Sequence, residues 1–232
     1  MRTLPVELTS CDGVVLRGER WGDGDDWLVL LHDLGHDLDS WRAVEDLAAF
    51  REGWSVLALD LRGHGGSDDP WHARRAVGDV EAAMRYARAQ GARSVCLGGA
   101  GAGATLALAA CAARDAPDAL VLVSPALLDG FDLSELRGPG VSKLFLVGSH
   151  DRAAAEATAE LRRVSIGQPL VVNFPTAQRG AELLEGDWAT QALEHLVAFV
   201  DEQRALARAP LALARTPPPA SMFPPAEPAE WV

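Results

Sequence analysis

The segment Gly98–Thr105, GGAGAGAT, combines residue types that could hold a phosphate or a reacting group. An apolar run ending at Leu97 precedes it, and an alanine-rich run of helical composition follows it. A strand, a glycine turn and a helix in this order direct free backbone N–H groups at one spot, where they bind anions or stabilise a developing negative charge. The first question is which group, if any, this turn holds.

Two nucleotide-binding patterns fit the segment only in part. The phosphate-loop pattern G-x-x-x-x-G-K-[ST] needs a lysine where this chain has Ala104, so the charge that reaches the β- and γ-phosphates is missing. The dinucleotide pattern G-x-G-x-x-A fits Gly99, Gly101 and Ala104. It also needs an acidic residue at the end of the next strand, and that strand ends at Ser124. We therefore expect no nucleotide and no other cofactor.

A third pattern is the nucleophile elbow G-x-S-x-G, a sharp turn that carries a serine between a strand and a helix. Two segments before the turn and two after it give it a context: LVLLHDLGHDLDSW, VLALDLRGHGGSD, KLFLVGSHD and LVVNFPTAQRGAELLEG. With SVCLGGAGAGATLAL in the middle, these five resemble, in order, the oxyanion loop, the D-x-R-G-x-G-x-S segment, the elbow, the acid-bearing strand and the histidine-bearing loop of the α/β-hydrolase superfamily. The resemblance to these esterase- and lipase-like proteins covers about residues 1–206.

The alternation of strand-like and helix-like segments agrees with that fold. Strands are predicted over 4–8, 14–21, 27–32, 54–60, 93–98, 119–124, 143–148 and 169–174, and helices over 39–50, 72–90, 102–110, 152–161 and 187–206. Such alternation predicts a mostly parallel sheet of about eight strands with helices on both faces. The first two strands should be antiparallel around Cys11-Asp12-Gly13, and Asp39 or Ser40 should cap the first helix. The stretch 125–142 is too short for a large cap domain.

Departures from the family pattern decide the expected chemistry. The alignment puts Gly101 at the nucleophile position and Arg179 at the base position, or Gln178 if the register shifts by one. Of the three triad positions implied by the resemblance, only the acid, Asp151, is retained. Loss of either the nucleophile or the base of such a triad costs roughly a millionfold in rate. We therefore expect a catalytically degenerate member with no intact catalytic residues, which binds or assembles with another molecule.

The oxyanion loop leaves room for an enzyme of another kind. It carries His32 followed by Asp33, where the family has glycine, and a carboxylate there would oppose the stabilisation of negative charge. The alternative hypothesis is a hydrolase with a displaced nucleophile such as Ser124, or a lyase or proton-transfer catalyst that uses Asp151 and His32.

The altered turn could instead attract an anion. The helix that begins near Ala102 and Gly103 presents free N–H groups, and Arg179 adds a permanent positive charge nearby. We expect Arg179 either to form an ion pair with Asp151 or to capture a small carboxylate or an acidic peptide end.

Composition limits the remaining classes. A formal charge of −12 argues against nucleic acid, and no apolar run is long enough for membrane insertion. The three cysteines have no metal-ligand spacing, so we expect no metal and a cytoplasmic location. Residues 207–232 form a proline-rich, extended tail in this interpretation, with three candidate anchors for a protein partner or for the protein's own surface: Met222, Phe223 and Trp231.

Overall fold

A single eight-stranded sheet forms the centre of the molecule. We describe a computed structural model of the chain, in which residues 3–45, 47, 53–112, 115–138 and 140–208 are described. The strand order is β1-β2-β4-β3-β5-β6-β7-β8. The strands are β1 (Leu4–Thr9), β2 (Val15–Gly22), β3 (Asp26–Leu31), β4 (Trp54–Leu59), β5 (Ser94–Ala100), β6 (Ala119–Val123), β7 (Ser142–Gly148) and β8 (Leu170–Phe174).

The pairing confirms the mostly parallel sheet. β1 pairs with β2 and β2 with β4 in antiparallel fashion, and every other neighbouring pair is parallel. The turn between β1 and β2 lies at Cys11-Asp12-Gly13, as predicted, and Gly13 has a φ of +89°, which glycine adopts without strain. The carboxyl ends of the parallel strands therefore meet at one edge, where the loops predicted to carry the site lie.

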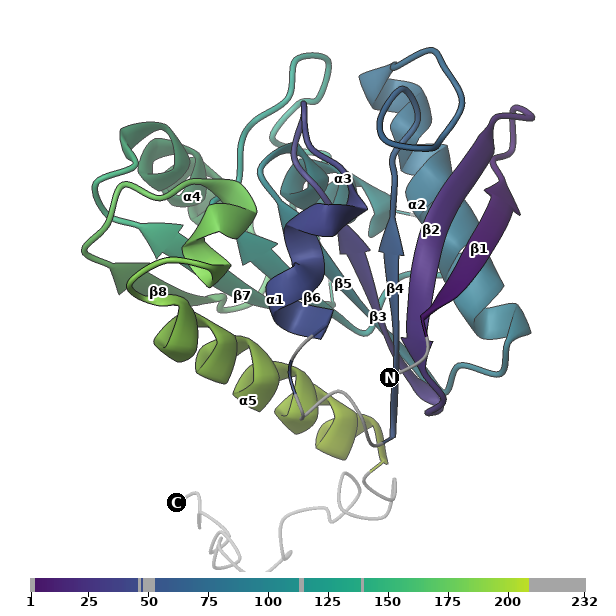
Figure 1. Cartoon of the computed structure of the whole chain (residues 1–232). Helices are drawn as coiled ribbons and strands as arrows, with labels where there is room; N and C mark the ends of the chain where they lie inside the picture. The colour runs from purple at the N-terminus through teal and green to yellow at the C-terminus, as the bar shows by residue number, and fades with distance from the viewer. Residues whose placement is uncertain (1–2, 46, 48–52, 113–114, 139, 209–232) are drawn as a thin grey trace, which may run out of the picture.

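Helices cover both faces of the sheet (Figure 1). On one face lie α1 (Arg42–Glu45) and α5 (Ala189–Arg208), and on the other α2 (Ala73–Ala89), α3 (Ala102–Ala110) and α4 (Arg152–Val164). Side chains of a strand point alternately to opposite faces, so Leu28 and Leu30 of β3 belong to one apolar cluster while Val29 and Leu31 belong to the other. Helices cover both faces of β3, and the strand is therefore apolar along most of its length.

The start of the first helix differs from the prediction. A 3₁₀ turn, η1 (Leu38–Trp41), precedes α1, and Asp37 caps it by accepting a hydrogen bond from Asp39 N–H at 3.0 Å. The predicted caps, Asp39 and Ser40, are wrong because the Leu38 N–H binds the carboxylate of Asp60 at 2.8 Å and so starts the turn earlier. Residues 46 and 48–50 of the predicted helix lie outside the described part.

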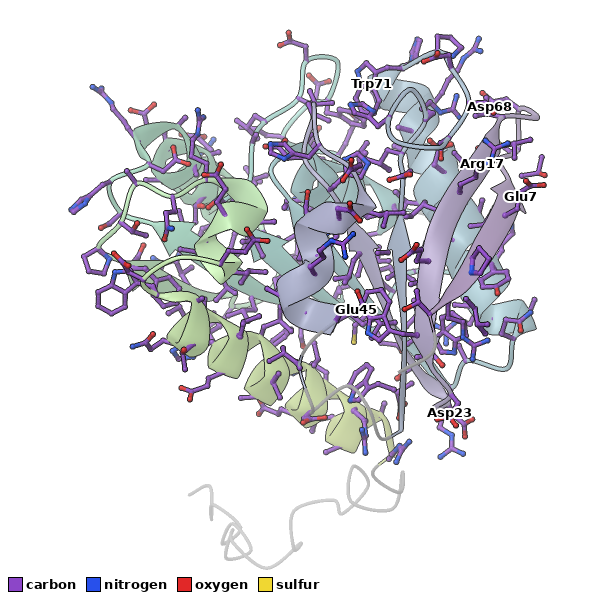
Figure 2. All side chains as sticks on the ribbon, viewed as in Figure 1. Glu7, Arg17, Asp23, Glu45, Asp68 and Trp71 are labelled. Carbon is purple, nitrogen blue, oxygen red and sulfur yellow. The ribbon has the colours of Figure 1, made fainter. Side chains whose placement is uncertain are left out.

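The loop after β4 supports the oxyanion loop. Asp60 is buried and accepts hydrogen bonds from the N–H groups of Leu38 and Gly66, and the Ser67 hydroxyl donates to its backbone carbonyl at 2.6 Å. Figure 2 shows Arg17 of β2 at this edge, where it pairs with Asp68 at 2.9 Å and with Glu7 at 3.8 Å. The segment that resembles D-x-R-G-x-G-x-S therefore ties two loops to the sheet.

The buried guanidinium of Arg62 also stabilises the loop after β4. Arg62 lies between the carboxylates of Asp79 at 2.6 Å and Asp12 at 2.7 Å, and it also donates to the Ser10 hydroxyl. The hydrogen bonds from Arg62 to Asp12 lower the pKa of Asp12 to about 2. The three partners together satisfy a guanidinium charge that would be costly to bury alone. Arg62 is thus committed to the fold.

Within the described residues, the remaining connections add no cap domain. The described residues between β6 and β7 form turns and no helix. Of the helices in the described part of the chain, none is long and apolar enough to cross a membrane. The last helix runs to Arg208, two residues beyond the predicted end, and the remaining tail residues, 209–232, lie outside the described part.

Candidate active site

The turn between β5 and α3 has the backbone of an elbow and no side chain at its apex. Gly101 has a φ of +51° and a ψ of −115°, a conformation that favours glycine. A Cβ on Gly99 would lie 2.4 Å from the carbonyl carbon of Gly103, and a Cβ on Gly103 would lie 2.3 Å from the Leu31 carbonyl oxygen. The glycine run therefore lets the start of α3 approach β3 and β5 closely.

The side chain of Asp33 fills the space above Gly101. A Cβ placed on Gly101 would lie 2.0 Å from the Asp33 Cγ. Asp33 Oδ1 accepts hydrogen bonds from the Ala102 N–H at 2.7 Å and the Leu34 N–H at 2.8 Å. In the elbow pattern, the residue after the nucleophile and the loop after β3 supply the N–H groups of the oxyanion hole. The protein's own carboxylate thus occupies both the hole and the nucleophile's place.

His32 holds the Asp33 loop in position. Its side chain is buried, and its Nε2 accepts a hydrogen bond from the Leu61 N–H at 3.0 Å. The proton therefore resides on Nδ1, which donates to the Asp33 carbonyl at 2.7 Å. Burial lowers the pKa of His32 below its usual value, and the neighbouring His64 acts in the same direction. Because both ring nitrogens form hydrogen bonds with backbone groups, the geometry does not support His32 as a proton-transfer group.

Asp151 and Arg179 form the ion pair expected from the sequence. The Arg179 Nε lies 3.4 Å from the Asp151 Oδ2. Asp151 Oδ1 also accepts a hydrogen bond from the Ala154 N–H at 3.3 Å, so this carboxylate caps α4. The side chain of Arg179 is 69% exposed and that of Asp151 is 6% exposed. The carboxylate is buried while its cationic partner stays in water. The alternative base position, Gln178, bonds locally to Thr176.

Ser124 has two unusual features. Its φ is +42°, the one positive value at a non-glycine residue in the described part of the chain. Its side chain is 3% exposed, and among the described residues its Oγ has no hydrogen-bond partner. Strained backbone and unsatisfied polar groups gather at functional sites more often than elsewhere. The residue lies at the carboxyl end of β6, where its N–H donates to the Leu146 carbonyl.

A cavity of about 510 Å³ opens beside Asp33. It is lined by Asp33, Leu34, His36, Ser40, Arg179, Gly180, Ala181, Glu182 and Glu185. Three carboxylates face one guanidinium there, and that guanidinium is paired with Asp151. The Ala102 N–H, a candidate anion donor, already binds Asp33, and Gly103 is buried against the Leu31 carbonyl of β3. An incoming anion would have to displace Asp33 or compete with Asp151.

Sequence reasoning identified these positions but missed how they connect. It placed Gly101, Asp151 and Arg179 at one edge of the sheet. In the structure, Asp33 lies beside them, since it touches Gly101 and a Cβ on Gly180 would lie 3.6 Å from its carboxylate. The Leu34 N–H was not predicted, and its one signal was the resemblance of LVLLHDLGHDLDSW to the oxyanion loop. Among the described residues, no cluster of three His, Cys, Asp or Glu could hold a metal ion.

Comparison with known proteins agrees with this fold. A model described as the alpha/beta hydrolase family matches residues 28–232. An esterase of Pyrococcus furiosus superposes with a TM-score of 0.70 at 16% identity, over 87% of this chain and 92% of the esterase. At this identity the likeness shows a shared fold and not a shared activity.

Two curated proteins share short segments with the chain. The dihydrolipoyllysine-residue acetyltransferase component of the acetoin cleaving system of Cupriavidus necator is 36% identical over 61 residues, 26% of this chain and 16% of that protein. The 2-succinyl-6-hydroxy-2,4-cyclohexadiene-1-carboxylate synthase of Klebsiella pneumoniae is 54% identical over 46 residues, 20% of this chain and 17% of that protein. The matched segments thus span less than a fifth of either relative.

Proposed function

This chain belongs to the α/β hydrolase family, and from that membership we propose that it is a non-catalytic member that acts by binding another molecule. The observation that carries the proposal is the carboxylate of Asp33, which accepts hydrogen bonds from the Ala102 and Leu34 N–H groups above Gly101. Ester hydrolysis in this family pattern needs a nucleophile, a base and an empty oxyanion hole. Here Gly101 and Arg179 supply neither of the first two, and Asp33 fills the third.

Competition with Asp33 would be hard for a substrate. A hydrogen bond from N–H to a charged carboxylate is about twice as strong as one to a neutral carbonyl. Asp33 is also tethered in place, because its backbone carbonyl is held by His32 and by the His36 N–H at 3.2 Å. An ester carbonyl would have to displace a stronger, preorganised acceptor, and no side chain at position 101 would then attack it.

The first test is an assay of the full chain for ester turnover. We expect no hydrolysis of p-nitrophenyl acetate or butyrate above background, and no stoichiometric labelling by a serine-directed fluorophosphonate. The variant Asp33→Asn tests the same point, because a neutral amide weakens the internal contact without adding a nucleophile. Robust turnover or stoichiometric labelling of the unmodified protein would overturn the non-catalytic proposal.

A second candidate function is a hydrolase with Ser124 as a displaced nucleophile. It is supported by the positive φ of this buried residue and by its Oγ, which has no hydrogen-bond partner in the described part of the chain. One protein of similar structure is an esterase. Fluorophosphonate labelling that maps to Ser124 and disappears in Ser124→Ala, but not in Ser40→Ala, would favour it. Labelling that is absent, or that maps elsewhere, would reject it.

The binding role includes a protein partner held by the tail, through Met222, Phe223 and Trp231. The support is compositional, because large apolar residues stand among prolines in an acidic chain. A partner captured by the full chain should be lost when the chain ends at Arg208, and its purified form should bind Trp231→Ala more weakly. Equal affinity for the full and the shortened chain would reject the tail as the docking element.

The proposed location is the cytoplasm. Within the described residues, Cys11, Cys96 and Cys111 are all free thiols, and persistent free thiols are typical of a reducing compartment.

A further inference from the structure

A second cavity lies away from the elbow, on the face of the sheet that α2 and α3 cover. It measures about 500 Å³ and lies between the start of α2, the end of α3 and the segment that joins β6 to β7. Its apolar lining consists of Val77, Ala109, Ala112, Phe131 and Ile166. Ile166 is 41% exposed, so apolar surface is open to solvent here. Ligand sites for small organic molecules are commonly of this size and mostly apolar.

Cationic side chains border this apolar surface. An adjoining cavity of about 390 Å³ shares Ser134 and Arg137 with the first and adds Arg163. We call the two cavities together the Arg137 groove. Its charged lining is Arg74, Arg137, Arg163 and a single carboxylate, that of Glu135. A local excess of positive charge is notable in a chain of formal charge −12.

The charges of the groove are not equally engaged. Arg74 holds Glu135 through two hydrogen bonds of 2.8 and 2.9 Å, and Arg163 lies 2.7 Å from Glu160. No ion pair or hydrogen bond engages the Arg137 guanidinium within the part of the chain that the structure describes. A guanidinium without an acceptor, beside an apolar surface, is available to a ligand that brings its own carboxylate or phosphate.

Contacts within the protein hold the walls of the groove in place. The Arg74 guanidinium lies 4.6 Å from the centre of the Phe131 ring. The Arg137 carbonyl accepts a hydrogen bond from the Ile166 N–H at 3.0 Å. Phe131 and Val77 also pack against the larger apolar cluster of the core. A preformed groove of this kind needs little ordering when a ligand binds, which favours affinity.

We propose that the Arg137 groove binds an amphipathic anion, a small molecule with an aliphatic body and a terminal carboxylate or phosphate. The body would lie over Phe131 and Ile166, and the anionic head would bind Arg137. The cavity beside Asp33 suits such a ligand poorly, because three carboxylates line it. The site is separate from the elbow, so this inference goes beyond the non-catalytic role and does not depend on it.

Calorimetric titration of the full chain tests the ligand class. Decanoate and decyl phosphate carry both the aliphatic body and the charge, decanol carries only the body, and acetate carries only the charge. We expect saturable binding of decanoate or decyl phosphate, and the tighter of the two identifies the head group. Decanol and acetate should bind at least about tenfold more weakly, because each loses one part of the contact. No binding of either anion, or equal binding of decanol, would overturn the proposal.

Matched variants test the place of binding. Arg137→Ala should weaken the binding of the better anion by at least about tenfold, and Ile166→Asp should weaken it further by placing a negative charge beside the body. Arg162→Ala is the control, because Arg162 is exposed on α4 and lines neither cavity. Asp33→Asn should leave the affinity unchanged. Equal affinity of Arg137→Ala and Arg162→Ala, or a higher or lower affinity in Asp33→Asn, would place the ligand elsewhere.

Discussion

Asp33 occupies the space that any side chain at position 101 would need, since a Cβ there would lie 2.0 Å from its Cγ. The carboxylate also accepts hydrogen bonds from the two N–H groups at the start of α3 and in the loop after β3. These two roles depend on each other. Glycine at 101 leaves room for the carboxylate, and the carboxylate satisfies donors that would otherwise need water or a substrate. A serine at 101 is therefore incompatible with Asp33 in its present position.

Restoring the triad should consequently require three changes. Gly101→Ser with Arg179→His should hydrolyse p-nitrophenyl acetate weakly at most, and neither single variant should act, because nucleophile and base work as a unit. Adding Asp33→Gly should raise the rate of the double variant by opening the oxyanion hole. Gly101→Ser should also destabilise the protein by about 1–3 kcal/mol, because its φ is strained for serine. A double variant as active as the triple one would show that Asp33 is no obstacle.

The burial of His32 predicts that the folded state loses stability in acid. Its pKa is lowered by burial, so between its folded value and the ordinary value of about 6.5 the unfolded chain binds more protons than the folded one. Stability should then be complete above about pH 7 and fall as the pH drops below about 6.5, by at most about 1.4 kcal/mol per pH unit. Urea unfolding at pH 7.5 and 5.5 measures this. His32→Gln should flatten the dependence, whereas the exposed His195→Gln should not.

The Arg179–Asp151 pair should contribute less than a fully buried pair. Because Arg179 is 69% exposed, its attraction to Asp151 is screened by water, and pairs of this kind contribute about 1 kcal/mol or less. Asp151 also keeps the Ala154 N–H as a partner when Arg179 is removed. We therefore expect Arg179→Ala to lower the unfolding free energy by about 1 kcal/mol in urea denaturation. A loss above about 3 kcal/mol would indicate a stranded buried charge instead.

At the scale of elements, a buried carboxylate fastens α5 to the sheet. Asp26, at the start of β3, is fully buried and pairs with Arg204 at 3.5 Å and with Arg208 of α5. The Ser94 hydroxyl of β5 donates to it at 2.7 Å. The apolar face of α5, with Leu196 and Val200, continues the attachment along the helix. The end of α5 is thus held by charge where its apolar contacts run out.

Removal of Arg204 and Arg208 should lower the unfolding free energy more than neutralisation of the Asp26 carboxylate. Arg204→Ala with Arg208→Ala leaves Asp26 as an unpaired buried carboxylate, so we expect a loss of about 3–5 kcal/mol in unfolding free energy. Asp26→Asn leaves no buried charge and should cost clearly less. The control is Arg152→Ala, whose side chain is 91% exposed in its pair with Glu156, and it should change stability by no more than about 0.5 kcal/mol. Equal losses in all three would show that Asp26 does not hold α5.

At the scale of the whole molecule, the single lysine of the chain can report on opening. Lys143 is 3% exposed, and its Nζ donates to the Val141 and Ile166 carbonyls at 2.9 Å each. Burial lowers its pKa, yet the amine is inaccessible in the folded state. Acetylation by an N-hydroxysuccinimide ester should therefore be slow in water, relative to added N-acetyl-lysine amide, and should accelerate with urea in step with unfolding. Rapid acetylation without urea would show that the segment after α4 opens locally.

Much of this fold could be predicted because the signals are local. Apolar periodicity and turn residues indicated the strands and helices, and the ends of parallel strands must meet at one edge, so Gly101, Asp151 and Arg179 were expected together. The cap at Asp37 was missed, because it depends on Asp60, a residue of the neighbouring strand end.

The sequence by itself determined that no serine stands at the elbow and no histidine at the base position. Only the tertiary structure decided what replaces them. β3 and β5 are neighbours in the sheet, and this adjacency brings the loop after β3 over Gly101 and aims the Asp33 carboxylate at the start of α3. Exposure was likewise a tertiary property, since the two members of one ion pair differ in it: Asp151 is buried and Arg179 is exposed to water. Residue types are local, whereas side-chain direction and burial depend on which distant segments the sheet places side by side.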